Sequence, residues 1–156
     1  MNYDNIERDF IERTLAILEQ YYKGLDKYPP EERYNHTLLI NCMLGIIILP
    51  NQKHVSLLPN EKLLQYKMKE YGLGNSRIGE SIKTTRDLVI QMRNSVAHFD
   101  IKCIPTDDEK WIKKVVFYKD GNLIIEIDDA DFYPFVQNIG KKIIQNIDQY
   151  NKMKRR

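Results

Sequence analysis

The chain contains few of the residues that define disulfide-stapled or metal-bound small folds. Its 156 residues include two cysteines, one tryptophan, seven glycines and six prolines. Cys42 and Cys103 lie far apart and belong to no CxxC pattern, so a metal site of that type is excluded and a disulfide framework is not expected. No internal repeat and no low-complexity segment is present.

Long hydrophobic runs and an excess of one charge are also missing. The longest apolar run, Leu38 to Leu49, includes Asn41 and is shorter than the roughly 20 residues of a membrane span. Net charge is +2, which is too small to indicate nucleic-acid binding from composition. The basic tail 152–156 is typical of a solvated helix end, with phosphate steering as the minor alternative. We expect a soluble, cytoplasmic protein.

What is present is the composition of a globular domain, with 42% hydrophobic and 29% charged residues and a length that suits one domain over 1–156. Helical periodicity predicts five helices, over 4–22, 38–49, 60–71, 78–99 and from 128–131 to 150. The second is apolar almost all round, so we place it at the centre and end it at Pro50.

The pattern changes between the last two predicted helices. Residues alternate in polarity over about 114–127 around Asp120-Gly121, a dipeptide that tolerates the positive φ angles of a type I′ turn. A hairpin alone is marginal in water, so it must pack on the helices. The predicted fold is mainly α, an up-and-down helical bundle with a β-hairpin appendage before the last helix.

The helix over 78–99 carries the most informative polar residues. Its core-facing stripe is predicted to be Ile78, Ile82, Val89, Met92, Val96 and Phe99. Asn94 and His98 are an i, i+4 pair that points roughly 160° away from this stripe, whereas Arg93 lies at its flank.

Arg93 and His98 are about 140° apart around the helix, which is poor geometry for one compact site. A symmetric dimer solves the problem by bringing both copies of Arg93, Asn94 and His98 into one cleft. On periodicity alone, the alternative is that His98 merely ends a helix and Arg93 is a surface charge.

The hexapeptide 93–98, near the end of the penultimate predicted helix, resembles the Arg-polar-x-x-x-His signature of the HEPN superfamily (higher eukaryotes and prokaryotes nucleotide-binding). The surrounding stretch 88–99 resembles the full motif. Segments 9–14 and 34–42 are similar to a group of small stand-alone HEPN proteins of bacterial plasmids and chromosomes. The similarity covers most of the chain.

The resemblance implies an HEPN-like fold and RNA cleavage without a metal or other cofactor, at a site shared by two copies of the chain. Arg93 and His98 would be the catalytic pair and Asn94 the supporting polar residue. Histidine as a residue type exchanges protons near neutral pH, and a guanidinium suits the extra charge of a phosphorane. Attack by a ribose 2′-hydroxyl restricts this chemistry to RNA.

The implied partners are RNA, a second copy of the chain and an antitoxin or regulatory protein, in a toxin or phage-defence effector. A non-catalytic nucleotide- or protein-binding dimerisation module is the second interpretation, and a structural four-helix adaptor is the third. Some HEPN toxins carry a modifiable tyrosine two residues beyond the histidine. Asp100 stands there in this chain, where it can cap the helix-end loop or hydrogen-bond His98.

The remaining polar candidates have mainly structural interpretations. His36 and His54 have no metal ligand at a useful spacing and are expected to be surface or cap residues. Asn41 is expected to be a buried amide that holds a neighbouring segment. Trp111 is expected to anchor the hairpin on the bundle. For Asp9, Glu12 and Arg13, on the polar side of the first helix, a role in supporting the site is left open.

Overall fold

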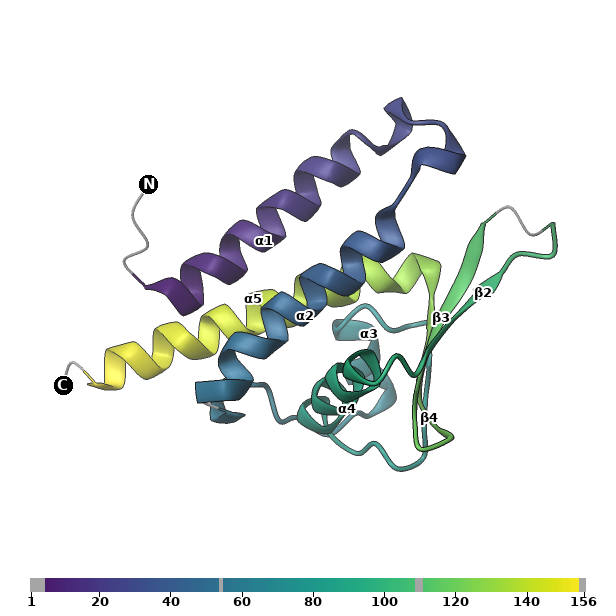
Figure 1. The fold of residues 1–156 in the computed structure, drawn as a ribbon. Helices are drawn as coiled ribbons and strands as arrows, with labels where there is room; N and C mark the ends of the chain where they lie inside the picture. Colours follow the sequence, from purple (N-terminus) through teal and green to yellow (C-terminus); the bar gives the residue numbers. More distant parts are fainter. Residues whose placement is uncertain (1–4, 54, 109–110, 155–156) are drawn as a thin grey trace.

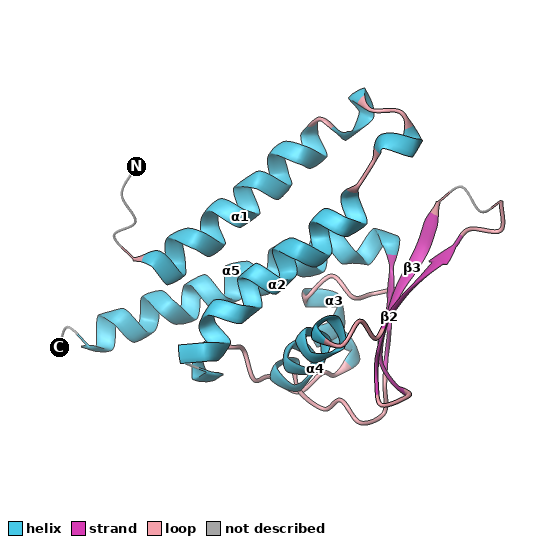
Figure 2. Cartoon of the chain, in the orientation of Figure 1, coloured by secondary structure: helices cyan, strands magenta, loops and turns pink. Residues whose placement is uncertain are grey.

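A computed structural model describes residues 5–53, 55–108 and 111–154 and shows a mainly helical fold with one antiparallel sheet (Figures 1 and 2). Three long helices pack on one another: α1 (Ile6–Lys23), α2 (Asn35–Lys53) and α5 (Asp129–Lys154). Short 3-10 turns occupy Leu25–Lys27, Pro30–Glu32 and Val55–Leu57. The predicted fold class is confirmed.

Helix α1 forms where local signals predicted it. The Asn5 side chain accepts the backbone N–H of Arg8 at 3.2 Å, and the backbone N–H of Gly24 closes the other end on the carbonyls of Tyr21 and Tyr22. Both ends of the helix therefore satisfy backbone groups that would otherwise lack partners. The side chains that α1 buries are Ile11, Thr14 and Leu18.

Helix α2 is central, as predicted, because it packs against α1, α4 and α5. Two details of the prediction are wrong. The helix continues past Pro50 to Lys53, and Asn41 is exposed rather than buried. The helix is therefore not covered all round, and the Asn41 amide needs no buried partner.

The middle of the chain is less helical than predicted. The expected helix over 60–71 shrinks to α3 (Gln65–Glu70), and the expected helix over 78–99 becomes strand β1 (Arg77–Ile78) followed by α4 (Thr85–Ala97). Ile82 is buried, but it precedes the helix. The predicted core stripe over 78–99 therefore included apolar residues that lie outside the helix.

The predicted hairpin is real, but it is the middle of a four-stranded antiparallel sheet rather than an appendage of two strands. Strands β3 (Ile112–Lys119) and β4 (Asn122–Asp128) are flanked by β2 (Ile101–Pro105) and β1, in the order β1-β4-β3-β2. Asp120 and Gly121 have φ angles of 51° and 78°, as the predicted type I′ turn requires. Helices α4 and α5 pack against β3 and β4.

The start of α5 is fixed by a buried carboxylate. Asp131 accepts hydrogen bonds from the backbone N–H and side-chain amide of Asn75 and from the Ser76 hydroxyl, at 2.7 to 3.0 Å. These contacts tie the loop before β1 to the last helix. The rest of α5 buries an apolar face that includes Phe132, Phe135, Val136, Ile139, Ile143 and Ile147.

Candidate active site

Helix α4 is held at its start by a reciprocal pair of hydrogen bonds. The Thr84 hydroxyl accepts the backbone N–H of Asp87, and the Asp87 carboxylate accepts the backbone N–H of Thr84, both at 3.1 Å. This capping box was not predicted, because the helix was expected to begin earlier. The core-facing side chains of α4 are Thr85, Leu88, Val89, Met92 and Ser95.

The end of α4 is closed by a Schellman motif. The backbone N–H of Phe99 donates to the carbonyl of Val96 at 3.1 Å, and that of Asp100 donates to the carbonyl of Ser95 at 2.8 Å. Phe99 takes the left-handed position with φ 56°, where glycine is usual. The chain then turns into β2, and the Tyr118 backbone N–H donates to the carbonyl of Asp100 at 2.9 Å.

Phe99 was predicted to be part of the core stripe, and this is wrong. Its side chain is 90% exposed, directly beside His98. The helix ends at Ala97, and the left-handed residue redirects the chain, so helical periodicity no longer applies at position 99. The result is a fully presented aromatic ring next to the candidate catalytic histidine.

The side chains of Asn94 and His98 lie off the core, as the periodicity predicted, and Arg93 lies beside them. Arg93 and Asn94 are half-buried and His98 is exposed. Arg93 Nη1 donates to Asn94 Oδ1 at 3.2 Å, and Asn94 Nδ2 lies 3.5 Å from Gln91 Oε1. Ser95 faces inward, where its hydroxyl donates to the carbonyl of Gln91 at 2.9 Å. The structure thus joins Arg93 to Asn94 through their side chains.

The His98 imidazole stands apart from that pair. His98 is the C-cap of α4, and its backbone N–H donates to the carbonyls of Asn94 and Val96. Within the described part of the chain the imidazole has no hydrogen-bond partner, and the Asp100 side chain does not bond to it. Asp100 contributes to the helix end through its backbone alone.

Ile90 and Ala97, two apolar residues of α4, have different surroundings. Ile90 is half-buried and packs against the protein's own core, whereas Ala97 is exposed. Only the last turn of α4 therefore presents an apolar group beside the motif, and Phe99 enlarges that group.

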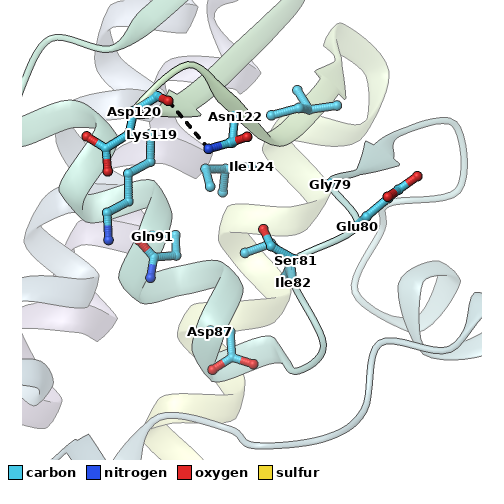
Figure 3. Close-up of a pocket in the computed structure, with 11 residues that line it drawn as sticks. Gly79, Glu80, Ser81, Ile82, Asp87, Gln91, Lys119, Asp120, Asn122 and Ile124 are labelled. Atoms are coloured by element: carbon cyan, nitrogen blue, oxygen red, sulfur yellow. Dashed lines mark hydrogen bonds between the residues drawn. The ribbon is translucent and has the colours of Figure 1, made fainter.

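A polar pocket of about 1050 Å³ lies between α4, the loop that follows β1 and the turn between β3 and β4 (Figure 3). Its wall on α4 is made by Asp87 and Gln91. With Asn94 and His98 these residues follow the spacing i, i+4, i+7 and i+11, so all four share one face of the helix. Sequence reasoning missed this pocket, because its walls come from segments far apart in the chain.

The other polar candidates are in structural settings. His36 Nε2 lies 2.8 Å from a carboxylate oxygen of Asp129, which joins the start of α2 to the start of α5. Trp111 is 41% exposed, and the guanidinium of Arg33 lies 5.8 Å from its ring centroid. Trp111 thus contacts the connection between α1 and α2, while His54 lies outside the described residues.

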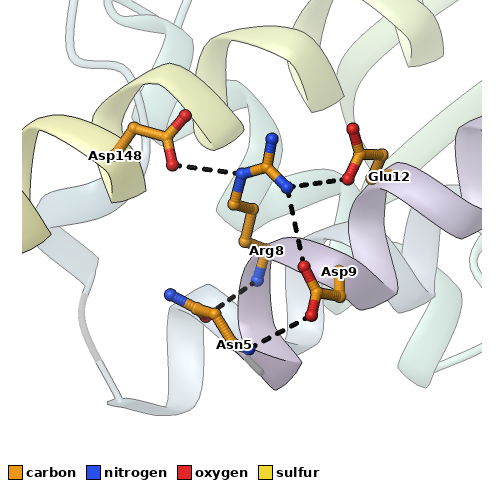
Figure 4. A network of polar contacts seen from close by, with 5 residues as sticks. All are labelled: Asn5, Arg8, Asp9, Glu12 and Asp148. Atoms are coloured by element: carbon orange, nitrogen blue, oxygen red, sulfur yellow. Dashed lines mark hydrogen bonds and ion pairs between the residues drawn. The ribbon is translucent and has the colours of Figure 1, made fainter. Parts of the chain in front are cut away.

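An ionic network joins α1 to α5 through Arg8 (Figure 4). Its guanidinium contacts Glu12 at 2.7 Å, Asp148 at 3.1 Å and Asp9 at 3.5 Å. None of these contacts involves the hexapeptide, so Asp9 and Glu12 serve helix packing. Arg13 is half-buried on the same helix.

Among the described residues, no group of three or more histidine, cysteine, aspartate or glutamate side chains is arranged to hold a metal ion. Over the same residues, no helix combines the length and apolar character needed to cross a bilayer. Both cysteines are free, with Cys42 buried and Cys103 exposed.

The fold and the motif define a helical domain that presents an arginine, an asparagine and a histidine at the end of its penultimate helix. Comparison with protein families identifies it further: the family model described as HEPN pEK499 p136 matches residues 1–150. The chain therefore belongs to this HEPN family, as its sequence resemblance predicted. HEPN domains are often ribonucleases. No curated protein and no solved structure matches the chain.

Proposed function

We propose that the protein is a metal-independent endoribonuclease in which Arg93 and His98 carry the chemistry and Asn94 positions them. The observation that carries the proposal is the exposed His98 imidazole, without a partner in the described chain, at the end of a helix whose Arg93–Asn94 pair also faces off the core. A structural histidine would normally be packed or hydrogen-bonded.

In the proposed reaction the ribose 2′-oxygen attacks the adjacent phosphorus while an imidazole accepts the 2′-hydroxyl proton. The bond from phosphorus to the 5′-oxygen breaks, and an imidazolium donates a proton to that oxygen. The products are a 2′,3′-cyclic phosphate and a 5′-hydroxyl end. The Arg93 guanidinium stabilises the negative charge that develops on the phosphorane.

The site is proposed to be shared by two copies of the chain. One copy of His98 cannot be both the proton acceptor and the proton donor in a single step, and no second described histidine lies on the motif face. A two-fold axis beside the end of α4 would supply the second imidazole and a second Arg93. The proposed partners are therefore RNA and an identical subunit.

Phe99 has a supporting role in this proposal. Its ring is exposed beside His98, and the chain accepts a strained backbone to hold it there. An exposed aromatic ring provides a stacking surface for an unpaired base, which would orient single-stranded RNA near the imidazole. The biological role proposed is that of a toxin or phage-defence effector controlled by an antitoxin or regulatory protein.

The test is cleavage of single-stranded RNA by the purified protein in EDTA, with analysis of the product ends. Arg93→Ala and His98→Ala are each expected to lower the rate by at least about a hundredfold, the usual contribution of a positioned acid–base group. Arg77→Ala is the matched control, since Arg77 is an exposed arginine on β1 whose guanidinium lies 3.7 Å from Glu126 of β4 rather than beside the motif.

Specific activity should also fall when the protein is diluted below the dimer dissociation constant. Cleavage that requires a divalent metal, or that survives both substitutions, contradicts the mechanism. Tight RNA or nucleotide binding without turnover would instead support a non-catalytic HEPN binding module.

A further inference from the structure

The pocket beside α4 has the size and the chemistry of a nucleotide-binding site. Its volume is about 1050 Å³, large enough for a base and its ribose, and it opens to solvent between three segments (Figure 3). Nothing in the motif accounts for it, because Arg93, Asn94 and His98 do not line it.

Several of its polar groups are available to a ligand. The Gln91 side chain makes only the long 3.5 Å contact to Asn94, in which its oxygen accepts, so its amide N–H groups have no acceptor in the described chain. Lys119 is half-buried and forms no ion pair with any described residue. Asp87 uses one carboxylate oxygen, Oδ2, in the capping box, which leaves the other as an acceptor. In Figure 3 Lys119 and Gln91 extend toward the same space.

The pocket is continuous with the motif in two ways. Gln91 contacts Asn94 directly, and Asp87 and Gln91 share their helix face with His98. The turn that carries Lys119 is also held against the end of α4, because the neighbouring Tyr118 N–H donates to the carbonyl of Asp100 at 2.9 Å. A strand of RNA that places a phosphate at His98 can therefore lay an adjacent nucleotide along this face.

The opposite wall is fixed in place before any ligand binds. The backbone N–H of Gly79 donates to the carbonyl of Ile124 at 2.9 Å, and a Cβ at position 79 would lie 1.8 Å from the carbonyl oxygen of Leu123. Only glycine allows this approach of the loop to β4. A pre-formed wall lowers the ordering cost of binding and favours selection by shape.

From these observations we infer that the pocket binds the base of the nucleotide next to the scissile phosphate, with Gln91 and Asp87 contacting the base edge and Lys119 contacting the sugar–phosphate backbone. This inference rests on the proposed ribonuclease function, because cleavage at His98 defines which nucleotide lies next to the scissile phosphate. Guanine fits best, because its adjacent N1–H and N2–H donors match the free carboxylate oxygen of Asp87 and its O6 acceptor matches the free amide N–H groups of Gln91. Uracil offers a single donor and fits less well.

The first test is binding, which requires no catalysis. Full-length His98→Ala protein is titrated with guanosine 3′-monophosphate or uridine 3′-monophosphate at millimolar concentrations, and backbone amide shifts are followed by NMR. We expect shifts confined to residues 79–82, Gln91 and the turn at 119–124, with guanosine bound more tightly than uridine. Gln91→Ala should weaken guanosine binding about tenfold, the effect of losing one well-placed hydrogen-bonding group.

The second test is cleavage specificity in the wild-type background. Gln91→Ala and Lys119→Ala are expected to raise KM, and Gln91→Ala to flatten the preference among RNA sequences, while kcat changes little. Gln20→Ala and Lys27→Ala are matched controls, because both residues are exposed and lie on the far side of the chain from this pocket, in α1 and the turn after it.

The two tests separate this inference from the proposed function. Nucleotide binding at the pocket that depends on Gln91, in a protein that never cleaves RNA, would remove the ribonuclease proposal and keep the pocket. Cleavage that depends on His98, with no amide shifts at the pocket and with KM and sequence preference unchanged in Gln91→Ala, would overturn the pocket assignment. Equal binding of guanosine and uridine would overturn the base assignment.

Discussion

Replacing Phe99 with glycine is expected to make the protein more stable and less active. Phe99 occupies the left-handed position of the Schellman motif at φ 56° with its side chain 90% exposed. A left-handed conformation costs an L-residue about 1–2 kcal/mol, and glycine avoids this cost. The exposed ring contributes little burial, so its removal creates no cavity.

The opposing effect is the greater freedom of glycine in the unfolded chain, which costs about 0.4–1 kcal/mol. The difference predicts a gain of about 1 kcal/mol in the free energy of unfolding. For a chain of 156 residues this gain raises Tm by about 2–4 °C. Differential scanning calorimetry and urea unfolding both measure the change.

Asp120→Gly is the matched control for the backbone argument. Asp120 is also left-handed, with φ 51°, but aspartate tolerates this region better than phenylalanine, so a smaller gain is expected. RNA cleavage by Phe99→Gly should fall about tenfold or more through loss of base stacking, whereas Phe99→Tyr should retain activity. A Phe99→Gly protein that is less stable than wild type would refute the strain argument, and full activity would refute the stacking role.

Two further predictions concern the surroundings of the site. Gly79→Ala should lower the free energy of unfolding by about 3 kcal/mol, because its Cβ would meet a backbone carbonyl of β4. Gly74→Ala is the control, because its Cβ meets only a side chain at 4.0 Å, and it should change the urea midpoint little. Burial raises the pKa of Glu61, but the Tyr71 hydroxyl and Lys142 hold it below the ordinary value of 4.5. A carboxylate with a depressed pKa stabilises the fold above pH 4.5. The loss of stability in Glu61→Gln should therefore be present at pH 7 and shrink as the pH falls below 4.5. A loss of stability that grows in acid would contradict this reasoning.

Local signals predicted much of the fold. The first helix, the Asp120-Gly121 turn and the last helix each depend on residues close together in the chain. The sequence did not predict strands β1 and β2, because both depend on pairing with residues far along the chain. Strand β2 is mostly exposed and ends in Pro105, so it carries no alternating pattern and exists only because it pairs with β3.

In the candidate site, too, some features are encoded locally and others depend on tertiary contacts. The outward direction of Asn94 and His98 follows from helical period, because the core face of α4 is set by a few apolar residues within the same helix. The sequence by itself also determined the family, through the hexapeptide and its helical context, and the match over residues 1–150 confirms it. These features are local, so they are visible in one segment of chain.

Only the tertiary structure decided what surrounds the motif. Phe99 lies outside the predicted core stripe because the backbone changes direction at the end of α4 to reach β2. The pocket exists because β4, the loop at Gly79 and α4 meet in space, although 40 or more residues separate β4 from the loop. Such approaches depend on the packing of whole elements, and no periodicity within a single segment encodes them.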